Sequence, residues 1–217
     1  DITSSKIADQ KIRESEARYR NLFENSPVSL WEVNLSEAKS YLTRLEESGI
    51  VDVFSHIESH PDVAREIVRK MKIVNVNLAT LRLFKARRKS ELLKHFERIA
   101  NRQNLFLFLA ALRAFKSGRT DFRSEAEHRT LQGDLLRTVE SVSLAPGSES
   151  WDKVFVTILD ISGRYKMEEA LRQSEERYRL IADNINEVFW LKQPGDPLRT
   201  VYVSPAFERI WNREAAE

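Results

Sequence analysis

The first 31 residues of this chain recur without a gap at residues 160–190, and this repeat limits the fold more than any other feature. Asp1 aligns with Asp160 and Trp31 with Trp190, a constant offset of 159 residues. Self-similarity at a fixed period is the signature of an array of like units. We therefore expect similar units joined by the same connector.

Both copies of the repeat have the composition of a helix. Thr3 and Ser162 are suitable N-caps. The residues that follow are rich in Glu, Arg, Ala and Leu and, apart from Gly163, contain no Gly or Pro, a composition that favours helix. Alternating steps of four and three then separate residues on one face, as in the seam of a short parallel coiled coil. The seam residues are Ala8, Ile12, Ser15, Tyr19 and Leu22 in the first copy, and Met167, Leu171, Ser174, Tyr178 and Ile181 in the second.

Two interpretations of this seam stay open. The helix can be a connector that pairs with its copy in a homodimer, or an amphipathic helix that lies on its own domain. The repetition favours the connector, because a segment that joins similar units recurs wherever two units meet.

Composition excludes several classes of protein. The chain has 217 residues, enough for one to two domains, and its net charge of +2 is too small to indicate a nucleic acid or an anionic membrane as partner. The absence of Cys excludes disulfides, thiolate metal sites and Cys nucleophiles. The longest apolar run, residues 105–112, is far shorter than a membrane span, and no signal peptide is visible. We expect a cytoplasmic piece of a longer protein, because the chain begins without Met and with a strand-ending motif.

Periodicity and turn residues predict the order of the elements. The expected elements are a connector helix over 4–25, a strand over 28–34, a helical segment over 35–70, a strand over 72–77, helices over 78–84, 90–99 and 102–117, strands over 121–131, 135–144 and 152–161, and a second connector helix. The expected domains are a connector over 1–25, a complete domain over 26–161, a connector over 162–185, and the truncated start of a second domain over 186–217.

A second match locates an insertion. Val74, Val76 and Ala79 correspond to Val201, Val203 and Ala206 at an offset of 127 residues. This offset is 32 residues shorter than that of the connector, so the first unit carries 32 extra residues between its first two strands. The insertion corresponds to the helical segment of 35–70.

In this order, the motifs of the chain resemble those of the PAS domain. Residues 13–25 (RESEARYRNLFEN) resemble the helix that leads into the family's domain, and Asn77 and Ala79 resemble its strand-to-helix step. Phe122, Arg123 and the turn at Gly133 fit its third strand and hairpin. Asp160, Ile161 and Ser162 resemble the closing Asp-Ile-Thr signature.

The resemblance implies an α+β fold: a five-stranded antiparallel sheet in the order 2-1-5-4-3 with helices on one face. It also implies a sensory module in which Asp160, Ile161 and Ser162 relay a signal to the output helix. The insertion and the missing Gly after Phe84 depart from the family's pattern.

A pocket between the sheet and the helices is the candidate ligand site. Its expected lining residues are Trp31, Asn75, Phe106, Phe108, Arg123, Glu125 and His128. The alternative is that the aromatic residues fill the core and the charged residues face solvent. If Arg123 or His128 points inward, an anionic ligand follows, because a buried cation needs a partner.

Other chemistry finds little support in the residues. His56 and His60 have a metal-ligand spacing, but no third ligand is evident and Pro61 interrupts the helix. His95 lies beside the expected inward face, which argues against haem, and a flavin adduct or a thioester chromophore would require Cys. The basic cluster Lys85, Arg87, Arg88 and Lys89 is expected to be a solvated loop. We therefore predict no catalytic residues, no metal, no haem and no flavin, and an unidentified small molecule stays the candidate ligand.

Two functional hypotheses follow. In the first, the chain is part of a bacterial-type signalling protein, such as a sensor histidine kinase of a two-component system or a diguanylate cyclase. Ligand or partner binding would then change the pairing of the connector helices and act on an output domain of the same parent chain. In the second, the chain is a dimerisation or interaction module without a ligand, and the insertion is its partner surface.

Overall fold

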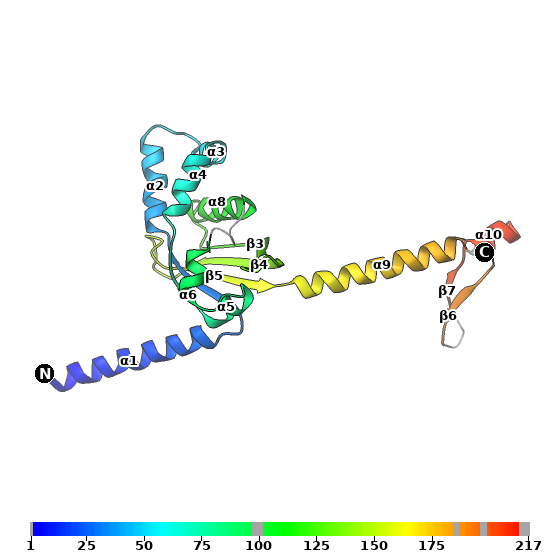
Figure 1. Cartoon of the computed structure of the whole chain (residues 1–217), viewed down its shortest axis with the longest axis horizontal. Helices are drawn as coiled ribbons and strands as arrows, with labels where there is room; N and C mark the ends of the chain where they lie inside the picture. The colour runs from blue at the N-terminus through cyan, green and yellow to red at the C-terminus, as the bar shows by residue number, and fades with distance from the viewer. Residues whose placement is uncertain (1, 97–101, 185–186, 196–198, 213–217) are drawn as a thin grey trace. The chain divides into compact units, whose positions relative to one another are not determined.

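The computed structural model describes residues 2–96, 102–184, 187–195 and 199–212 (Figure 1). Its backbone divides into two units, Asp1–Ser162 and Gly163–Glu217. The side chains of residues 1–9 lie outside the described part, so the predicted seam position Ala8 has no structural account. None of the described helices combines the length and the apolar content needed to cross a bilayer.

The first unit is built on a five-stranded sheet of β1 (Ser29–Asn34), β2 (Lys72–Val76), β3 (Asp121–Arg129), β4 (Leu135–Leu144) and β5 (Val154–Asp160). The strand order is β2-β1-β5-β4-β3, and every neighbouring pair is antiparallel. The central strand β5 reads VFVTILD, and its β-branched and aromatic residues suit a pleated surface that is covered on both sides. The predicted fold class and sheet order are confirmed.

The loop that connects β3 and β4 is longer than the sequence predicted. β3 ends at Arg129, two residues before the expected boundary, because residues 130–134 close a turn. The Thr130 amide donates to the Asp134 carbonyl over 2.9 Å, and the Gly133 amide donates to the Thr130 carbonyl over 2.9 Å. Gly133 has φ +94°, a conformation that favours glycine because it has no Cβ.

The register of the strands separates the sheet into two faces. Trp31 pairs with Val76 and with Val156, and these residues lie on the inner face, toward the helices. Glu32 pairs with Asn75 and Phe155, on the outer face. Since side chains alternate along a strand, these pairs assign the neighbouring positions as well.

Six described helices follow β1 in the first unit: α2 (Ser36–Glu47), α3 (Val53–Ser59), α4 (Pro61–Arg69), α5 (Leu78–Leu83), α6 (Lys89–Lys94) and α8 (Arg102–Lys116). Figure 1 shows α2, α3, α4 and α8 on the same side of the sheet. The insertion supplies α2, α3 and α4. Asp52 caps α3 by accepting from the Ser55 amide over 3.0 Å, and Pro61 opens α4, where its missing N–H costs nothing.

The insertion shares the core of the domain. Leu42, Ile57 and Ile67 from its three helices are essentially inaccessible to solvent, and they belong to one apolar cluster with Phe84 and Leu112. The insertion is therefore part of the folded unit rather than an appended subdomain.

Helix α1 (Ile2–Asn25) packs with its last turns on the outer face of the same sheet. The Tyr19 hydroxyl donates to Glu32 Oε2 over 3.0 Å, and Phe23 is only 5% exposed. Ile12 and Leu22 are 56% and 69% exposed. Tyr19 thus contacts its own domain, as the amphipathic interpretation expects, while Ile12 and Leu22 have no cover within the described unit.

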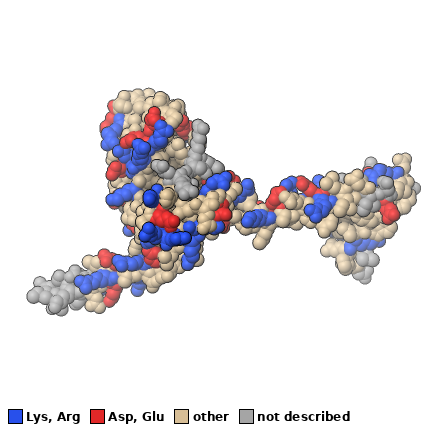
Figure 2. Space-filling view, viewed as in Figure 1, with Lys and Arg blue, Asp and Glu red and all other residues tan. Residues whose placement is uncertain are grey.

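The second unit contains α9 (Ser162–Asn184), β6 (Trp190–Gln193), β7 (Arg199–Val203) and α10 (Ala206–Trp211). Strands β6 and β7 form an antiparallel pair. Predicted seam residues of α9 are exposed, with Met167 at 76%, Leu171 at 61% and Tyr178 at 71%. Figure 2 shows charged side chains of both signs along the visible face of α9.

The repeat extends to individual hydrogen bonds. In the first unit, Asn77 Oδ1 accepts from the Leu30 amide over 3.1 Å, and the Asn77 amide donates to the Leu30 carbonyl over 3.1 Å. In the second unit, Ser204 Oγ accepts from the Phe189 amide over 3.1 Å, and the Ser204 amide donates to the Phe189 carbonyl over 2.9 Å. Leu30 and Phe189 occupy equivalent positions in the two copies, as do Asn77 and Ser204, so both copies fix the strand-to-helix step in the same way.

Candidate ligand cavity and its connection to the helices

A cavity of about 710 Å³ lies between the inner face of the sheet and the helices α4 and α8. This volume is within the range of about 300–1,000 Å³ that is usual for small-molecule sites. All five strands contribute inward side chains to the floor: Trp31 and Val33 of β1, Ile73 of β2, Phe122 and His128 of β3, Glu140 and Val142 of β4, and Val154, Val156 and Ile158 of β5. The floor is therefore apolar except for His128 and Glu140 at the β3 end.

Helix α8 forms a second wall of the cavity. Its consecutive apolar residues 105–109 all line the space, and Phe106 remains 47% exposed. A helix that is apolar on every side needs cover on every side. Leu112 of α8 is fully buried in the core, so the helix is anchored there while Phe106 and Phe108 face the cavity.

Three polar side chains meet inside the cavity, from β3, β4 and α8. His128 is 5% exposed, and its Nε2 lies 2.5 Å from Oε1 of Glu140. The Asn104 Nδ2 lies 3.1 Å from His128 Nδ1. This geometry suits the imidazole tautomer in which Nδ1 accepts from the Asn104 amide and the N–H at Nε2 donates to the Glu140 carboxylate. The hydrogen bonds among Asn104, His128 and Glu140 therefore join α8 to the β3 edge of the sheet.

The insertion forms the remaining wall. Pro61, Ala64, Arg65, Val68 and Arg69 of α4 line the cavity, together with Glu58 of α3. This contribution of the insertion was not predicted from the sequence. The available signal was the position of the insertion, which leads directly into β2, combined with the helical spacing of Ala64, Val68 and Arg65, Arg69.

Four of the predicted lining residues, Trp31, Phe106, Phe108 and His128, line this cavity. Asn75, Arg123 and Glu125 do not. Asn75 pairs with Glu32, Arg123 with Ser141 and Glu125 with Val139, all on the outer face. These three residues are therefore removed from the candidate lining.

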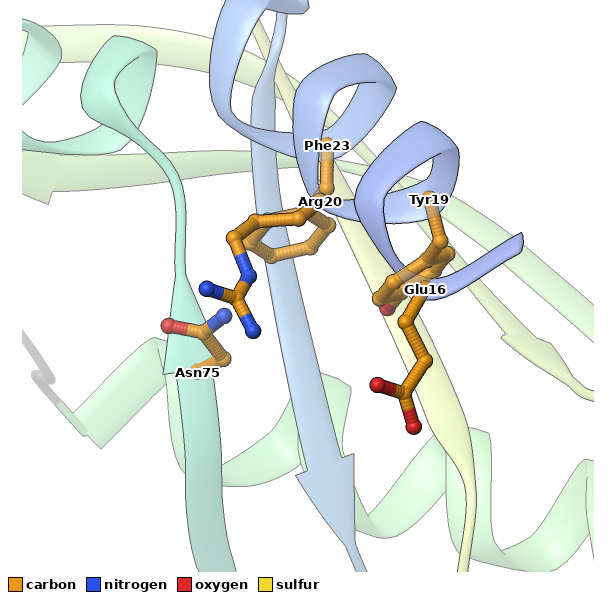
Figure 3. Close-up of a pocket in the computed structure, with 5 residues that line it drawn as sticks. All are labelled: Glu16, Tyr19, Arg20, Phe23 and Asn75. Atoms are coloured by element: carbon orange, nitrogen blue, oxygen red, sulfur yellow. The ribbon is translucent and has the colours of Figure 1, made fainter. Parts of the chain in front are cut away.

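Asn75 lies instead in a smaller pocket of about 240 Å³ between α1 and β2, together with Glu16, Tyr19, Arg20 and Phe23. Figure 3 shows the Arg20 side chain extending toward Asn75. Burial and then the hydrogen bond to Glu32 raise the pKa of Tyr19 to about 12. This pocket belongs to the contact between α1 and its own domain.

A chain of hydrogen bonds connects the cavity with α1. The Trp31 indole N–H donates to Ser29 Oγ over 3.1 Å, and Ser29 Oγ lies 2.8 Å from Thr80 Oγ1. Thr80 Oγ1 donates to Asn77 Oδ1 over 2.9 Å, and Asn77 Nδ2 donates to the Phe23 carbonyl over 3.0 Å. A side chain of the cavity floor is thereby joined to the last turns of α1.

The predicted relay segment is attached to β4. The Ile161 amide donates to the Arg137 carbonyl over 2.8 Å, and the Arg137 amide donates to Ser162 Oγ over 2.9 Å. Asp160 Oδ1 accepts from the Ser162 amide over 2.8 Å. The prediction that Ser162 supplies the cap is therefore corrected: the Asp160 carboxylate caps the first turn, and the Ser162 hydroxyl bonds to the strand.

The remaining candidate residues lie outside the cavity. The His56 and His60 rings stack with centroids 4.0 Å apart, and no group of three potential metal ligands occurs among the described residues. His95 ends α6 and does not line the cavity. In the basic cluster, Lys85 pairs with Asp134 over 2.8 Å and Lys89 with Glu24 over 2.6 Å, so these two side chains are tied to the domain.

No protein-family model matches the chain, and the comparison with curated proteins found no match. Solved structures are similar in fold. The PAS domain of an HTR-like protein from Haloarcula marismortui is 14% identical, with a TM-score of 0.43, over 72% of this chain and 99% of that one. A domain of the sensory box sensor histidine kinase/response regulator from Geobacter sulfurreducens is 17% identical, with a TM-score of 0.42, over 69% and 96%.

The Rhodobacter sphaeroides LOV protein is 14% identical, with a TM-score of 0.44, over 69% of this chain and 68% of that one. The prediction that this chain holds neither haem nor flavin stays a prediction, since the lack of Cys excludes only covalent attachment through a thiol. The strand order, the helices on the inner face and the closing Asp160–Ser162 segment give the first unit of this chain the fold of a PAS domain.

Proposed function

We propose that the first unit is the sensory module of a longer signalling protein and that it binds a small, mainly apolar molecule in the cavity between sheet and helices. The observation that carries this proposal is the cavity itself. It has the size and the lining of a binding site, with apolar walls and one buried polar group around His128.

The proposed signal is a change in how the connector helices attach to the sheet. A ligand can shift this equilibrium only by its differential affinity for the two packings. Trp31 and Ile158 line the cavity and lie on β1 and β5. β1 is bonded to the end of α1 through Asn77, and β5 ends at Asp160, whose carboxylate accepts from the first amide of α9. Displacement of either strand would therefore be transmitted to a helix.

The proposed output is a parallel pairing of connector helices in a homodimer, which would act on an output domain such as a histidine kinase or a diguanylate cyclase. The exposed seam of α9 supports this pairing. Met167, Leu171 and Ile181 are at least half exposed, and burial of such side chains stabilises a coiled coil.

The same seam favours a second candidate function, a dimerisation module that holds no ligand. A cavity-filling substitution separates the two functions. Val142→Phe places a larger side chain into the cavity, whereas Val139→Phe makes the same change on the outer face of the same strand. Both variants should fold, because the cavity and the open face each offer space.

The test is a thermal-shift screen of apolar compounds against the wild type and both variants. We expect at least one compound to raise the melting temperature of the wild type and of Val139→Phe, but not of Val142→Phe. A screen in which no compound stabilises the wild type, or in which the three proteins respond equally, would favour the ligand-free module. The visible absorption spectrum of the purified chain tests the prediction on haem and flavin directly.

A further inference from the structure

Helix α4 places two arginines at the cavity. Arg65 and Arg69 are four residues apart, so they lie on one face of the helix, and both line the cavity. Both side chains are exposed, which locates them at its mouth rather than in its depth. α4 belongs to the insertion, and on the wall that the insertion forms the two guanidinium groups and the Glu58 carboxylate are the charged groups among otherwise apolar side chains.

The charges around the cavity are unequally compensated. The carboxylate of Glu140 holds His128, and that of Glu58 lies 3.6 Å from Arg113. Arg65 has a partner in Asp62, one turn earlier and in an exposed position, where ion pairs contribute little. Within the described part of the chain, Arg69 has no ion-pair partner. The mouth beside α4 therefore carries one positive charge without an ion-pair partner among the described residues, that of Arg69.

The opposite end of the cavity disfavours an anion. α4 leads directly into the edge strand β2, whereas His128 lies on the other edge strand, β3. Four strand spacings separate these edges, on the order of 19 Å. At the β3 end, Nε2 of His128 is already occupied by Glu140, and this carboxylate would repel a second one. An anionic ligand would therefore place its charge at α4 and its apolar part between α8 and the sheet.

We propose that the ligand is an amphiphilic carboxylate with one unbranched alkyl chain, whose head group binds Arg65 and Arg69 and whose chain fills the cavity. This inference rests on the proposed binding function and adds the class of ligand. The planar guanidinium suits a carboxylate because it can donate two parallel hydrogen bonds. The apolar floor and α8 supply the surface that an alkyl chain requires.

The test compares decanoate with 1-decanol by isothermal titration of the whole 217-residue chain. The two probes share the alkyl chain and differ in the charge of the head group. We expect decanoate to bind about tenfold more tightly, which is the usual gain from one charge-assisted hydrogen bond. Octanoate should bind about sixteenfold more weakly than decanoate, at about fourfold for each methylene removed from the apolar wall.

Variants locate the head group. Arg69→Gln should weaken decanoate binding about tenfold and leave 1-decanol binding unchanged, and Arg65→Gln should act in the same direction. Arg69→Lys keeps the charge but removes the planar fork, so its loss should be intermediate. Arg123→Gln is the matched control, because Arg123 is an exposed arginine on the outer face of the sheet and does not line the cavity.

The outcomes separate this inference from the function on which it rests. Equal affinity for decanoate and 1-decanol, or equal losses in Arg69→Gln and Arg123→Gln, would overturn the assignment of a carboxylate and leave an apolar cavity site intact. If neither probe binds and the thermal-shift screen finds no stabilising compound, the proposed function fails with it.

Discussion

Asn77 connects three elements of the domain, and its loss should destabilise the fold more than any surface change. The side chain is completely buried. Its Oδ1 accepts from the amides of Leu30 and Thr80, and its Nδ2 donates to the carbonyls of Phe23 and Val28. Substitution by Ala removes the cap of α5, worth about 1 kcal/mol, and leaves up to three further backbone groups without a partner, at about 1–3 kcal/mol each where no water reaches them.

Water can reach some of these groups, so we expect Asn77→Ala to lower the free energy of unfolding by about 3–5 kcal/mol. Asn77→Ser should lose about half as much. Ser204 is the equivalent residue of the second unit. Its hydroxyl accepts from the Phe189 amide and donates to the Glu187 carbonyl, so a serine can replace two of the bonds that Asn77 makes. Asn75→Ala, on the outer face two residues earlier, should cost at most about 1 kcal/mol.

Equilibrium urea unfolding followed by circular dichroism measures these differences, with the midpoints converted through a common slope. The reasoning is refuted if Asn77→Ala costs less than about 1 kcal/mol, or if the Ala and Ser variants are equally unstable. The first result would mean that the hydrogen bonds are replaced without loss. Equal instability of the Ala and Ser variants would mean that the shape of the Asn77 side chain, and not its polar atoms, stabilises the connection between β2 and α5.

Three further predictions concern the helices. Folding raises the pKa of Tyr19 from 10.0 to about 12, so its contribution to the free energy of unfolding is complete below pH 10 and should be lost as the pH rises through 12. Tyr19→Phe should remove this pH dependence of stability, as measured by urea unfolding at a series of pH values. Asp160→Ala should cost about 1 kcal/mol through the lost cap and increase amide exchange in the first turn of α9, while an unchanged exchange rate would argue against the cap. Leu171→Glu should shift the chain toward monomer in analytical ultracentrifugation, and Ala170→Glu beside the seam should not. Equal behaviour of the two variants would contradict the proposed pairing of α9 through this seam.

The sequence predicted the sheet order because the PAS-like motifs are spread along the whole unit, and the repeat marked where each copy begins. It predicted Trp31, Phe106, Phe108 and His128 as cavity residues because large apolar or half-polar side chains in these elements must find cover. The prediction that Arg123 lines the cavity was wrong, because a one-residue change in strand register exchanges the two faces of a sheet.

The outward position of Asn75 follows from its place beside the inward Val76, but the inward position of Ile73 needed a detail that the sequence does not reveal. The ladder between β1 and β2 shifts its register between Glu32 and Val33, so Asn75 pairs with Glu32 while Ile73 pairs with Val33. Val74 is left out of the pairing and is 52% exposed. A bulge of this kind reverses the alternation of side chains locally, and KIVNVN gives no signal for it.

The insertion was located by arithmetic on the two offsets, but its role was not. The three amphipathic helices of the insertion can face the core, a partner or solvent, and only tertiary packing decides among these possibilities. Ile57 and Ile67 turned out to be fully buried, and the residues between them bring Arg65 to the cavity mouth. The charge that underlies the proposed ligand class is therefore a product of the packing, not of a motif.

Hydrogen exchange with and without a compound that stabilises the wild type, but not Val142→Phe, tests most directly whether the cavity is coupled to the helices. We predict that the compound changes amide exchange in the last turns of α1 and at residues 161–165, through Asn77 and Asp160, in addition to β1 and β5. Binding that alters exchange only around the cavity, with both helix attachments unchanged, would contradict the account.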